Sequence, residues 1–162
     1  MNNAGAGFVG STLESTKEGI DLTFGVNVYG AIFLVQAVVP HMPRGGRIIN
    51  ISSVLGSAVQ KGTANYPASK AALTHLTRSM AVEWAKFGIR VNAIAPGYFQ
   101  TELNTEFVES DQGKSMLKRM PQRRLGDLAE LSGALLLLAS DASSYMTGSV
   151  VTVDGGLSLA LV

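Results

Sequence analysis

Tyr66 and Lys70 are the residues whose types and spacing say most about chemistry. They stand four positions apart, and on a helix this spacing places a phenol and an ammonium group on one face, within interaction distance. A free tyrosine has a pKa of about 10 and is a poor base near neutrality, but a cation a few ångströms away favours the phenolate. The pair therefore indicates proton exchange with a substrate. An accidental pairing on a solvated helix face is the alternative that the bare spacing leaves open.

Ser53 adds a hydroxyl group to this pair. It stands thirteen residues before Tyr66, after a short apolar run over residues 46–51 that predicts a buried strand. Ligands of open α/β sheets bind outside the carboxyl ends of the strands. Ser53 is therefore placed to hydrogen-bond a carbonyl oxygen and to hold it against the tyrosine hydroxyl.

Asn27 is a polar amide within an otherwise apolar stretch of predicted helix. Such a side chain is expected either to cap a local irregularity of the helix or to hold a water molecule. Three further serines, Ser52, Ser57 and Ser69, are interpreted as turn formers, which is the usual role of serine in loops. Asn27 is therefore the one of these four that we treat as a candidate site residue.

The composition restricts the chemistry to hydroxyl, amine, amide and carboxylate groups. The 162 residues contain no cysteine and two histidines, so neither a thiolate nucleophile nor a metal site is expected. Thirteen Lys and Arg against twelve Asp and Glu leave no charge surplus for binding nucleic acid or a membrane surface. The uninterrupted apolar runs are shorter than the roughly 18 residues that span a bilayer. No secretory leader is recognised, so a cytoplasmic protein is expected.

The elements that must position these residues alternate between helix and strand. Apolar residues at helical spacing predict a long helix over residues 15–42 and a second over 63–87 that Gly88 ends. Strands are predicted over residues 46–51, 89–95 and 149–153, short helices over 101–120, and a further helix capped by Asp127. Alternation of this kind predicts one domain over residues 1–162, with a parallel sheet of about three strands flanked by helices.

In this order the motifs resemble the short-chain dehydrogenase/reductase family, and the resemblance covers essentially the whole chain. The matching positions are the turn Asn3-Ala4-Gly5, then Asn27, Ser53, Tyr66 and Lys70, and finally the segment from Pro96-Gly97 to Thr101. Residues 141–148 and 153–156 resemble the family's C-terminal signature. Among the members, the 3-oxoacyl-(acyl-carrier-protein) reductases are the most similar. The implied fold is a Rossmann-like, doubly wound parallel sheet.

The resemblance implies hydride transfer between NAD or NADP and the carbonyl or alcohol carbon of a ketoacyl thioester or a small hydroxy or keto compound. Tyr66 would act as general acid and base, Lys70 would lower its pKa and bind the nicotinamide ribose, and Ser53 would orient the substrate oxygen. Asn27 would hold a water molecule that links Lys70 to solvent. The implied cofactor contacts are Asn3, Ala4, Gly5, Tyr66, Lys70, Pro96, Gly97, Phe99 through its backbone, and Thr101.

Members of the family begin with a strand, a glycine-rich turn and a helix that bind the pyrophosphate. No such segment precedes the turn at Asn3, so we expect an N-terminally truncated sheet whose strand at 46–51 has an unpaired edge. The residue that distinguishes NAD from NADP would lie in that segment. A homodimer or homotetramer is implied, because the helices of the family's subunit interfaces are present. A non-catalytic remnant that oligomerises or binds another polypeptide is the alternative.

Overall fold

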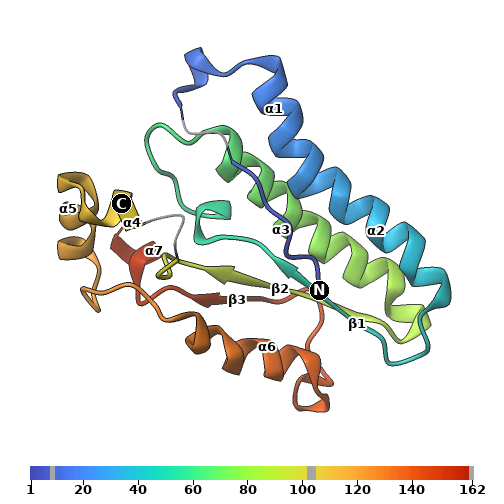
Figure 1. Ribbon diagram of the computed structural model, residues 1–162. Coiled ribbons are helices and arrows are strands. Elements are labelled where there is room, and N and C mark those ends of the chain that lie inside the picture. The colour runs from blue at the N-terminus through green and yellow to red at the C-terminus, as the bar shows by residue number, and fades with distance from the viewer. Residues whose placement is uncertain (8–9, 102–104, 161–162) are drawn as a thin grey trace.

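The computed structural model describes residues 1–7, 10–101 and 105–160, which form a parallel sheet between two layers of helices (Figure 1). Strands β1 (Arg47–Ile51), β2 (Arg90–Pro96) and β3 (Val150–Val153) lie in the order β1-β2-β3. Both pairings are parallel, with Ile49 of β1 opposite Asn92 of β2. The predicted fold class, a Rossmann-like α/β sheet of three parallel strands flanked by helices, is confirmed.

The first two strands are short runs of apolar residues that are buried on both faces. Ile48 and Ile49 of β1 and Val91 and Ile94 of β2 are each at most 7% exposed. Parallel strands are connected by helices, and these helices cover both faces of the sheet. A nearly continuous apolar run, without alternation, is therefore the pattern that such strands require.

The long helix predicted over residues 15–42 is present, but it contains an irregular turn. Regular helix α1 (Lys17–Phe24) is followed by one π-helical turn (Gly25–Tyr29) and then by α2 (Gly30–Val38). A π-helical turn inserts one residue into the helix and changes the direction in which its side chains point. The buried Asn27 lies within this turn. The local irregularity expected at this residue is therefore observed.

Helix α3 (Asn65–Trp84) runs beside α2 on the same face of the sheet (Figure 1). The chain then passes through a 3₁₀ turn to Gly88, whose φ of 70° lies in the left-handed region that favours glycine. The predicted end of the helix is confirmed. A cluster between the two helices and the sheet has the buried members Val35, Ile48, Met80, Ala81, Ile89 and Val91.

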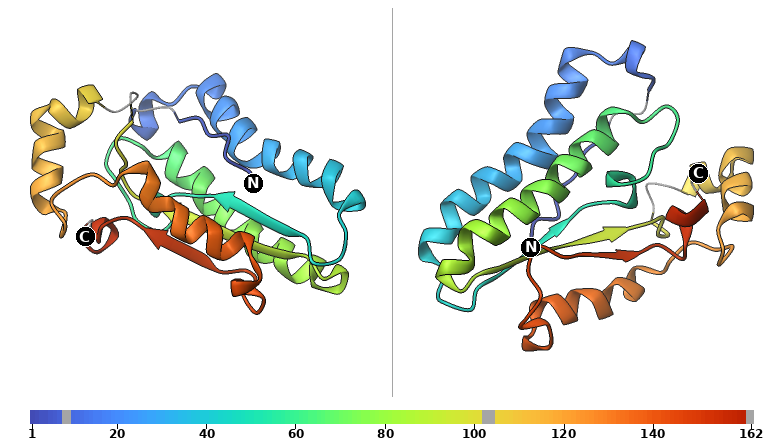
Figure 2. Two further views of the ribbon diagram at one scale, coloured as in Figure 1. Left: turned by 60° about the horizontal axis from the view of Figure 1, so that its bottom comes forward. Right: turned by 180° about the vertical axis from the view of Figure 1, so that it is seen from behind.

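The opposite face of the sheet is covered by α6 (Ser132–Ala139), as Figure 2 shows. Leu138 of α6 packs against Ile49 and Ile94. Asp127 caps the 3₁₀ turn that leads into α6 by accepting a hydrogen bond from the Ala129 amide. The cap predicted at this position is confirmed. Each large apolar side chain buried in these layers stabilises the fold by roughly 1.5–3 kcal/mol.

Short helices gather at the carboxyl end of the sheet. Two of them, α4 (Thr105–Glu109) and α5 (Asp111–Arg119), were predicted within residues 101–120, whereas α7 (Leu157–Ala160) was not. A third apolar cluster lies here, with the buried members Val54, Leu55, Met116, Met120 and Leu157, and Tyr66 packs against it. Residues 102–104 of the predicted segment lie outside the described residues.

The first residues of the chain lie along the outer edge of β1. Asn2 forms a parallel bridge with Asn50: its amide donates to the Ile49 carbonyl at 2.8 Å and its carbonyl accepts from the Ile51 amide at 2.9 Å. Its side-chain amide also donates to Asn50 Oδ1 at 2.7 Å. The expectation of an unpaired edge is therefore wrong at this point of β1, because Asn2 satisfies both backbone groups.

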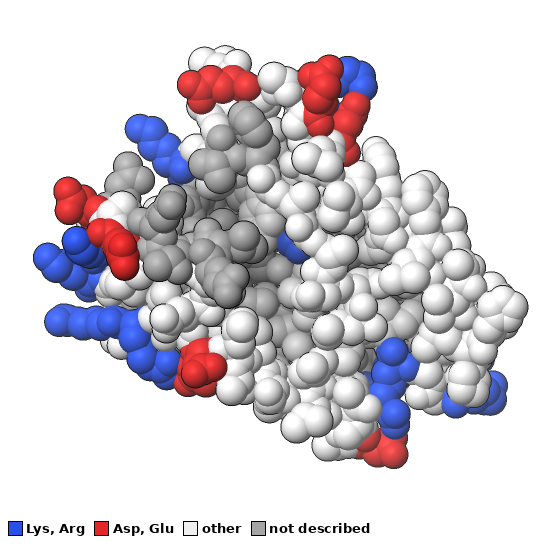
Figure 3. Space-filling view, in the orientation of Figure 1, with Lys and Arg blue, Asp and Glu red and all other residues white. Residues whose placement is uncertain are grey.

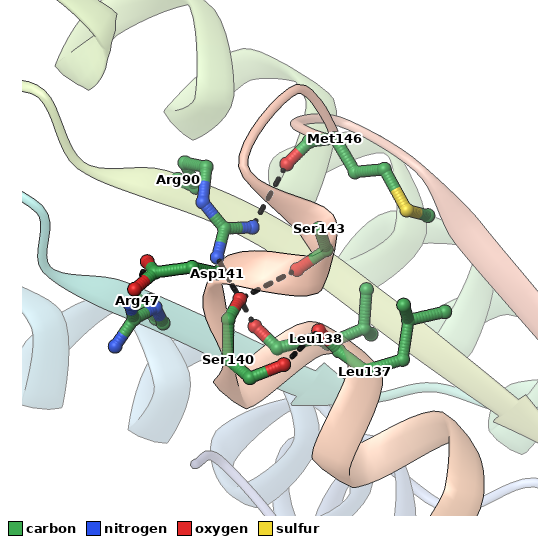
Figure 4. A network of polar contacts seen from close by, with 8 residues as sticks. All are labelled: Arg47, Arg90, Leu137, Leu138, Ser140, Asp141, Ser143 and Met146. Atoms are coloured by element: carbon green, nitrogen blue, oxygen red, sulfur yellow. Dashed lines mark hydrogen bonds and ion pairs between the residues drawn. The ribbon is translucent and has the colours of Figure 1, made fainter.

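Arg90, at the amino end of the sheet, forms hydrogen bonds with the segment that follows α6 (Figure 4). Its guanidinium donates to the carbonyl oxygens of Ser140 at 3.0 Å and Met146 at 3.1 Å. Arg47, the first residue of β1, forms an ion pair with Asp141 in the same turn. A guanidinium has five donors in a planar fork, so one arginine can satisfy several carbonyl groups. The network lies at the opposite end of the strands from Ser53.

One helix in the described part of the chain, Lys17–His41, is long and apolar enough to cross a membrane by length and composition alone. This helix mixes apolar with polar residues, so it is not one of the uninterrupted apolar runs considered above. Ile32 and Val35 of this helix pack in the cluster between α2, α3 and the sheet.

Candidate active site

An open cleft at the carboxyl ends of β1 and β2 brings most of the predicted site residues together. Its volume is ≈ 300 Å³. The lining consists of Asn3, Gly5, Ala6, Gly7, Ile51, Ser52, Ser53, Tyr66, Lys70, Pro96 and Gly97. Four sequence segments that are far apart along the chain therefore converge on one small volume, at the edge of the sheet where ligands of such folds bind.

Ser53 lies where β1 gives way to a tight 3₁₀ turn (Val54–Gly56). Its backbone is extended, and its Oγ accepts a hydrogen bond from the Leu55 amide at 3.1 Å. The residue is 9% exposed, and it lines the same cleft as Tyr66. The Leu55 amide therefore holds the hydroxyl in place in the cleft that contains the phenol.

Tyr66 and Lys70 lie one turn apart near the beginning of α3. The Lys70 ammonium donates to the Ile51 carbonyl at 2.9 Å, and its Nζ lies 5.6 Å from the centroid of the Tyr66 ring. Lys70 is 3% exposed, so the alternative of a solvated helix face does not apply to it. The amine is inside the protein, against the strand that carries Ser53.

Burial shifts the pKa values of both members of this pair. Burial raises the pKa of Tyr66 above its ordinary value, and the hydrogen bond with Ser53, which lowers it, does not offset this effect. Burial also lowers the pKa of Lys70 to about 8. Desolvation disfavours the charged forms of both groups, and the effect of Lys70 on the pKa of Tyr66 stays a prediction.

Asn27 joins the π-helical turn to the turn at the start of the chain. Its Oδ1 accepts from the Ala6 amide and its Nδ2 donates to the Ala6 carbonyl, both at 2.8 Å. Nδ2 also donates to Ser69 Oγ at 2.8 Å, and Ser69 Oγ donates to the Tyr66 carbonyl at 2.7 Å. Asn27 is therefore connected to the helix segment that carries Tyr66. Its role in holding a water molecule stays a prediction.

Two serines that were interpreted as turn formers have another role. Ser52 and Ser69 are 2% and 0% exposed, and each hydrogen-bonds the backbone of α3, at Lys70 and Tyr66 respectively. Their interpretation is wrong because both hydroxyls are buried where α3 meets its neighbours. Ser57 does bond within its own turn, to the Val54 carbonyl at 3.1 Å. The position of Ser69 directly before Lys70, on the same buried helix face, is the signal that was missed.

Glycines at the start of the chain leave room beside the amine and the phenol. A Cβ atom at Gly5 would lie 3.5 Å from Lys70 Nζ, and one at Gly7 would lie 3.0 Å from the Tyr66 ring. The backbone at Gly7 therefore approaches the phenol ring more closely than most side chains would allow, whereas a Cβ at Gly5 would make an ordinary van der Waals contact with the amine. This lining offers an ammonium donor, amide groups and open space, which fit the ribose and nicotinamide end of a dinucleotide.

The segment after β2 forms the other side of the cleft, and Gly97 permits its position. A Cβ atom at Gly97 would lie 2.7 Å from the Asp154 Cβ and 2.8 Å from its Cα. Phe99 forms a parallel bridge with Gly126 and lines a separate, smaller hollow with it. Of the predicted cofactor contacts, Pro96 and Gly97 line the cleft, whereas Ala4, Phe99 and Thr101 are not among its lining residues.

Replacing Gly97 with alanine is expected to destabilise the protein by about 1–3 kcal/mol, because the new methyl group meets backbone atoms that have no room to move. Gly133→Ala is the matched control, since no atom lies within 4 Å of a Cβ at this helical position. The control is expected to be neutral or stabilising by up to about 1 kcal/mol. Urea unfolding of both variants measures the difference. Equal stabilities would contradict the close approach of Gly97 to Asp154.

The described residues contain no group of three or more His, Asp or Glu side chains that could hold a metal ion. The cleft is lined by a phenol, hydroxyl groups and an amine, with backbone amides around them.

Comparison with known proteins finds relatives that match nearly the whole chain. The family model described as enoyl-(acyl carrier protein) reductase matches residues 1–158. A gluconate 5-dehydrogenase of Gluconobacter oxydans is 40% identical over 99% of this chain and 64% of its own length. A 3-oxoacyl-(acyl-carrier-protein) reductase of Thermotoga maritima is 41% identical over 97% of this chain and 64% of its own length.

Solved structures are similar over the same extent. The crystal structure of a gluconate 5-dehydrogenase from Burkholderia cenocepacia, in complex with NADP and tartrate, superposes with a TM-score of 0.93 and 40% identity, over 98% of this chain and 64% of the other. The chain thus spans about 64% of the length of these relatives. Because the family model matches residues 1–158 and the relatives are 40–41% identical over nearly the whole chain, the chain belongs to the short-chain dehydrogenase/reductase family.

Proposed function

We propose that this chain carries the catalytic residues of an NAD(P)-dependent oxidoreductase, which transfers a hydride between a nicotinamide and a carbonyl or alcohol carbon. The single observation that carries the proposal is the convergence of Ser53, Tyr66 and Lys70 in one cleft. The family relationship gives this convergence its chemical meaning, because the relatives named above are dehydrogenases and reductases.

Proton transfer in this proposal takes place at the Tyr66 hydroxyl. Because burial raises the pKa of Tyr66, the phenol is protonated at neutral pH and is ready to donate to a substrate oxygen during reduction. Ser53, which is fixed by the Leu55 amide, positions that oxygen by hydrogen bonding. A bound nicotinamide supplies the hydride for reduction and accepts it in oxidation.

The residues that would hold the nicotinamide and its ribose are Asn3, Gly5, Tyr66, Lys70, Pro96 and Gly97, which line the cleft. Lys70 would donate to the ribose hydroxyls from its place beside the Ile51 carbonyl. Ala4, Phe99 and Thr101 remain proposed cofactor contacts through their resemblance to the family pattern. Asn27 remains proposed as the residue that holds a water molecule near Lys70.

The proposed substrates are ketoacyl thioesters or small hydroxy or keto compounds. Support comes from the relatives, since one is a 3-oxoacyl-(acyl-carrier-protein) reductase and others are gluconate 5-dehydrogenases. The structures of relatives contain NADP or NAD, so both dinucleotides are proposed for this chain. We also propose that the protein works in the cytoplasm, where nicotinamide cofactors are available.

The test is a titration of the purified 162-residue chain with NADH and with NADPH, followed by nicotinamide fluorescence. Reduction of a keto sugar acid and of a ketoacyl thioester is measured in parallel. Saturable binding at micromolar concentration, together with substrate-dependent oxidation of the dinucleotide, is the expected result. Absence of both binding and turnover would overturn the proposal. It would favour the alternative of a non-catalytic module that oligomerises or binds another polypeptide.

We propose that the chain forms a homodimer or homotetramer through the outer side of α2 and α3. The apolar side chains exposed there are Tyr29, Phe33, Val38, Val82 and Phe87, which are between 43% and 80% exposed. The surface over α2 is largely free of charged side chains in the view of Figure 3. Several exposed apolar side chains on neighbouring helices are typical of a protein interface.

Phe33→Glu is therefore expected to convert the oligomer into a smaller species at micromolar concentration, because it would place a charge in the centre of the apolar surface. Light scattering coupled to size-exclusion chromatography measures the mass. Leu13→Glu is the control, since Leu13 is 99% exposed on the turn before α1 and is expected to leave the mass unchanged. A monomeric wild-type chain, or an unchanged mass for Phe33→Glu, would contradict the interface.

A further inference from the structure

Lys70 is held at both ends by two consecutive residues at the end of β1. Its ammonium donates to the Ile51 carbonyl at 2.9 Å, and its own backbone carbonyl accepts from Ser52 Oγ at 3.1 Å. Ser53 follows directly and lines the same cleft as Tyr66. Two successive residues therefore contact the amine and the backbone of Lys70, and the third lies in the cleft with Tyr66.

The contact between Ser52 and α3 is closely packed. Ser52 Oγ also shares a hydrogen bond of 2.6 Å with Thr74 Oγ1. A Cβ atom at Gly56 would lie 3.1 Å from the Lys70 carbonyl oxygen and 3.2 Å from Ser52 Oγ, so the 3₁₀ turn after Ser53 closes over this contact. Ser52 is 2% exposed. The hydroxyl thus connects β1, the turn and α3 at one point.

The buried Lys70 ammonium stays beside the Ile51 carbonyl only if α3 is held close to β1, which the Ser52 hydroxyl does. Its ammonium loses hydration on burial, and the side chain is flexible enough to reach solvent if the helix shifts outward. The bond to Ile51 depends on the distance between the backbones of α3 and β1. Ser52 fixes that distance at Lys70 itself, where a small shift has the largest effect on the amine.

We propose that Ser52 is a positioning residue, which acts with Thr74 to hold the Lys70 ammonium in the cleft and against the Ile51 carbonyl. The relevance of this role to catalysis rests on the proposed function, in which Lys70 binds the nicotinamide ribose. The role itself is a property of the chain and is measurable without dinucleotide.

The groups around Lys70 make its titration a direct measure of its position. Nζ faces the Tyr66 ring from its own helix and the turn at Gly5 from the start of the chain. The neighbouring Asn27 and Ser52 are neutral, so Tyr66 is the titratable group that faces Lys70 among the described residues. Burial is the cause of the lowered Lys70 pKa, and a lysine that turns to solvent returns toward 10.5, its ordinary value.

The experiment is an NMR titration of the full chain with ¹³C at the lysine ε-carbons, in which Lys70→Met assigns the Lys70 signal. The wild-type midpoint is expected at about 8. Ser52→Ala is expected to raise this midpoint by about one unit or more, because the amine gains access to water. Ser57→Ala is the matched control, because the Ser57 hydroxyl lies in the same loop but donates to the Val54 carbonyl and not to Lys70. In this variant the Lys70 midpoint is expected to stay at the wild-type value.

A folded Ser52→Ala chain with an unchanged Lys70 midpoint would overturn the proposal, as would an equal shift in Ser57→Ala. If Ser52→Ala does not fold, Thr74→Val replaces it, with a smaller shift expected in the same direction and no shift as the contradicting result. Because the readout needs neither cofactor nor substrate, it is independent of the titration that tests the proposed function. Failure of one leaves the result of the other interpretable.

Discussion

Replacing Tyr66 with phenylalanine is expected to lower kcat for carbonyl reduction by about 10²–10⁴, because the phenol oxygen is the proton donor and no other donor replaces it. The ring itself packs against the apolar cluster at the carboxyl end of the sheet, and phenylalanine preserves this packing. The dissociation constant for NADPH is expected to rise by no more than about tenfold, the effect of losing the one hydrogen bond that the phenol would make to the cofactor. Steady-state kinetics and fluorescence titration measure the two quantities.

Tyr98→Phe is the matched control for this substitution. Tyr98 packs in the same cluster, but its hydroxyl donates to Gln60 Oε1 at 3.1 Å and it does not line the cleft that contains Tyr66. Its removal is expected to change kcat by less than about threefold, since it removes one partly buried hydrogen bond. Similar losses in the two variants would show that the hydroxyl of Tyr66 has no special role in proton transfer.

The sequence predicted those parts of the fold that depend on local patterns. Examples are the apolar runs that form β1 and β2, and Gly88, which ends the helical segment after α3. The convergence of Ser53, Tyr66 and Lys70 was also predictable, because the carboxyl end of a parallel strand and the first turns of the following helix lie close together. These inferences need only the periodicity of the chain and the order of its elements.

Other features depend on contacts between distant segments and left no local signal. The Asn27 side chain hydrogen-bonds the backbone of Ala6, which lies 21 positions before it, and the side chain of Ser69, which lies 42 positions after it. The irregular turn around Asn27 therefore has its partners outside the helix. The raised pKa of Tyr66 has the same origin, since it results from burial by α5 and the turn at Val54–Gly56, which the spacing of Tyr66 and Lys70 does not reveal.

Lys70→Met is expected to stabilise the protein at pH 7 by about 1–2 kcal/mol. A buried ammonium is more costly than an apolar side chain of similar shape, and part of this gain is offset by loss of the bond to the Ile51 carbonyl. Methionine matches the length of the lysine stem, so packing is retained. Urea unfolding at several pH values measures the effect, and the same samples report whether dinucleotide binding is lost.

The pH dependence of stability distinguishes this cause from a simple change in packing. The folded-state pKa of Lys70 is lowered to about 8 from 10.5, so between these values the unfolded chain binds more protons than the native one. The wild-type free energy of unfolding therefore gains a contribution that rises with pH, by up to about 3 kcal/mol across the full window. Below pH 8 the lysine is protonated in both states, and this contribution to the slope disappears.

Comparison between pH 8 and 9 stays below the titration of Tyr66, whose pKa is about 10 in the unfolded chain and is raised above this value in the folded one. Lys70→Met is expected to lack the rise in this range, whereas Lys61→Met, at an exposed lysine, is expected to keep it. Parallel curves for wild type and Lys70→Met would contradict burial of the amine. If Lys70→Met loses both the rise in the free energy of unfolding and the binding of dinucleotide, the Lys70 ammonium binds the ribose, although its burial destabilises the fold. Such a residue is retained through selection for activity over stability.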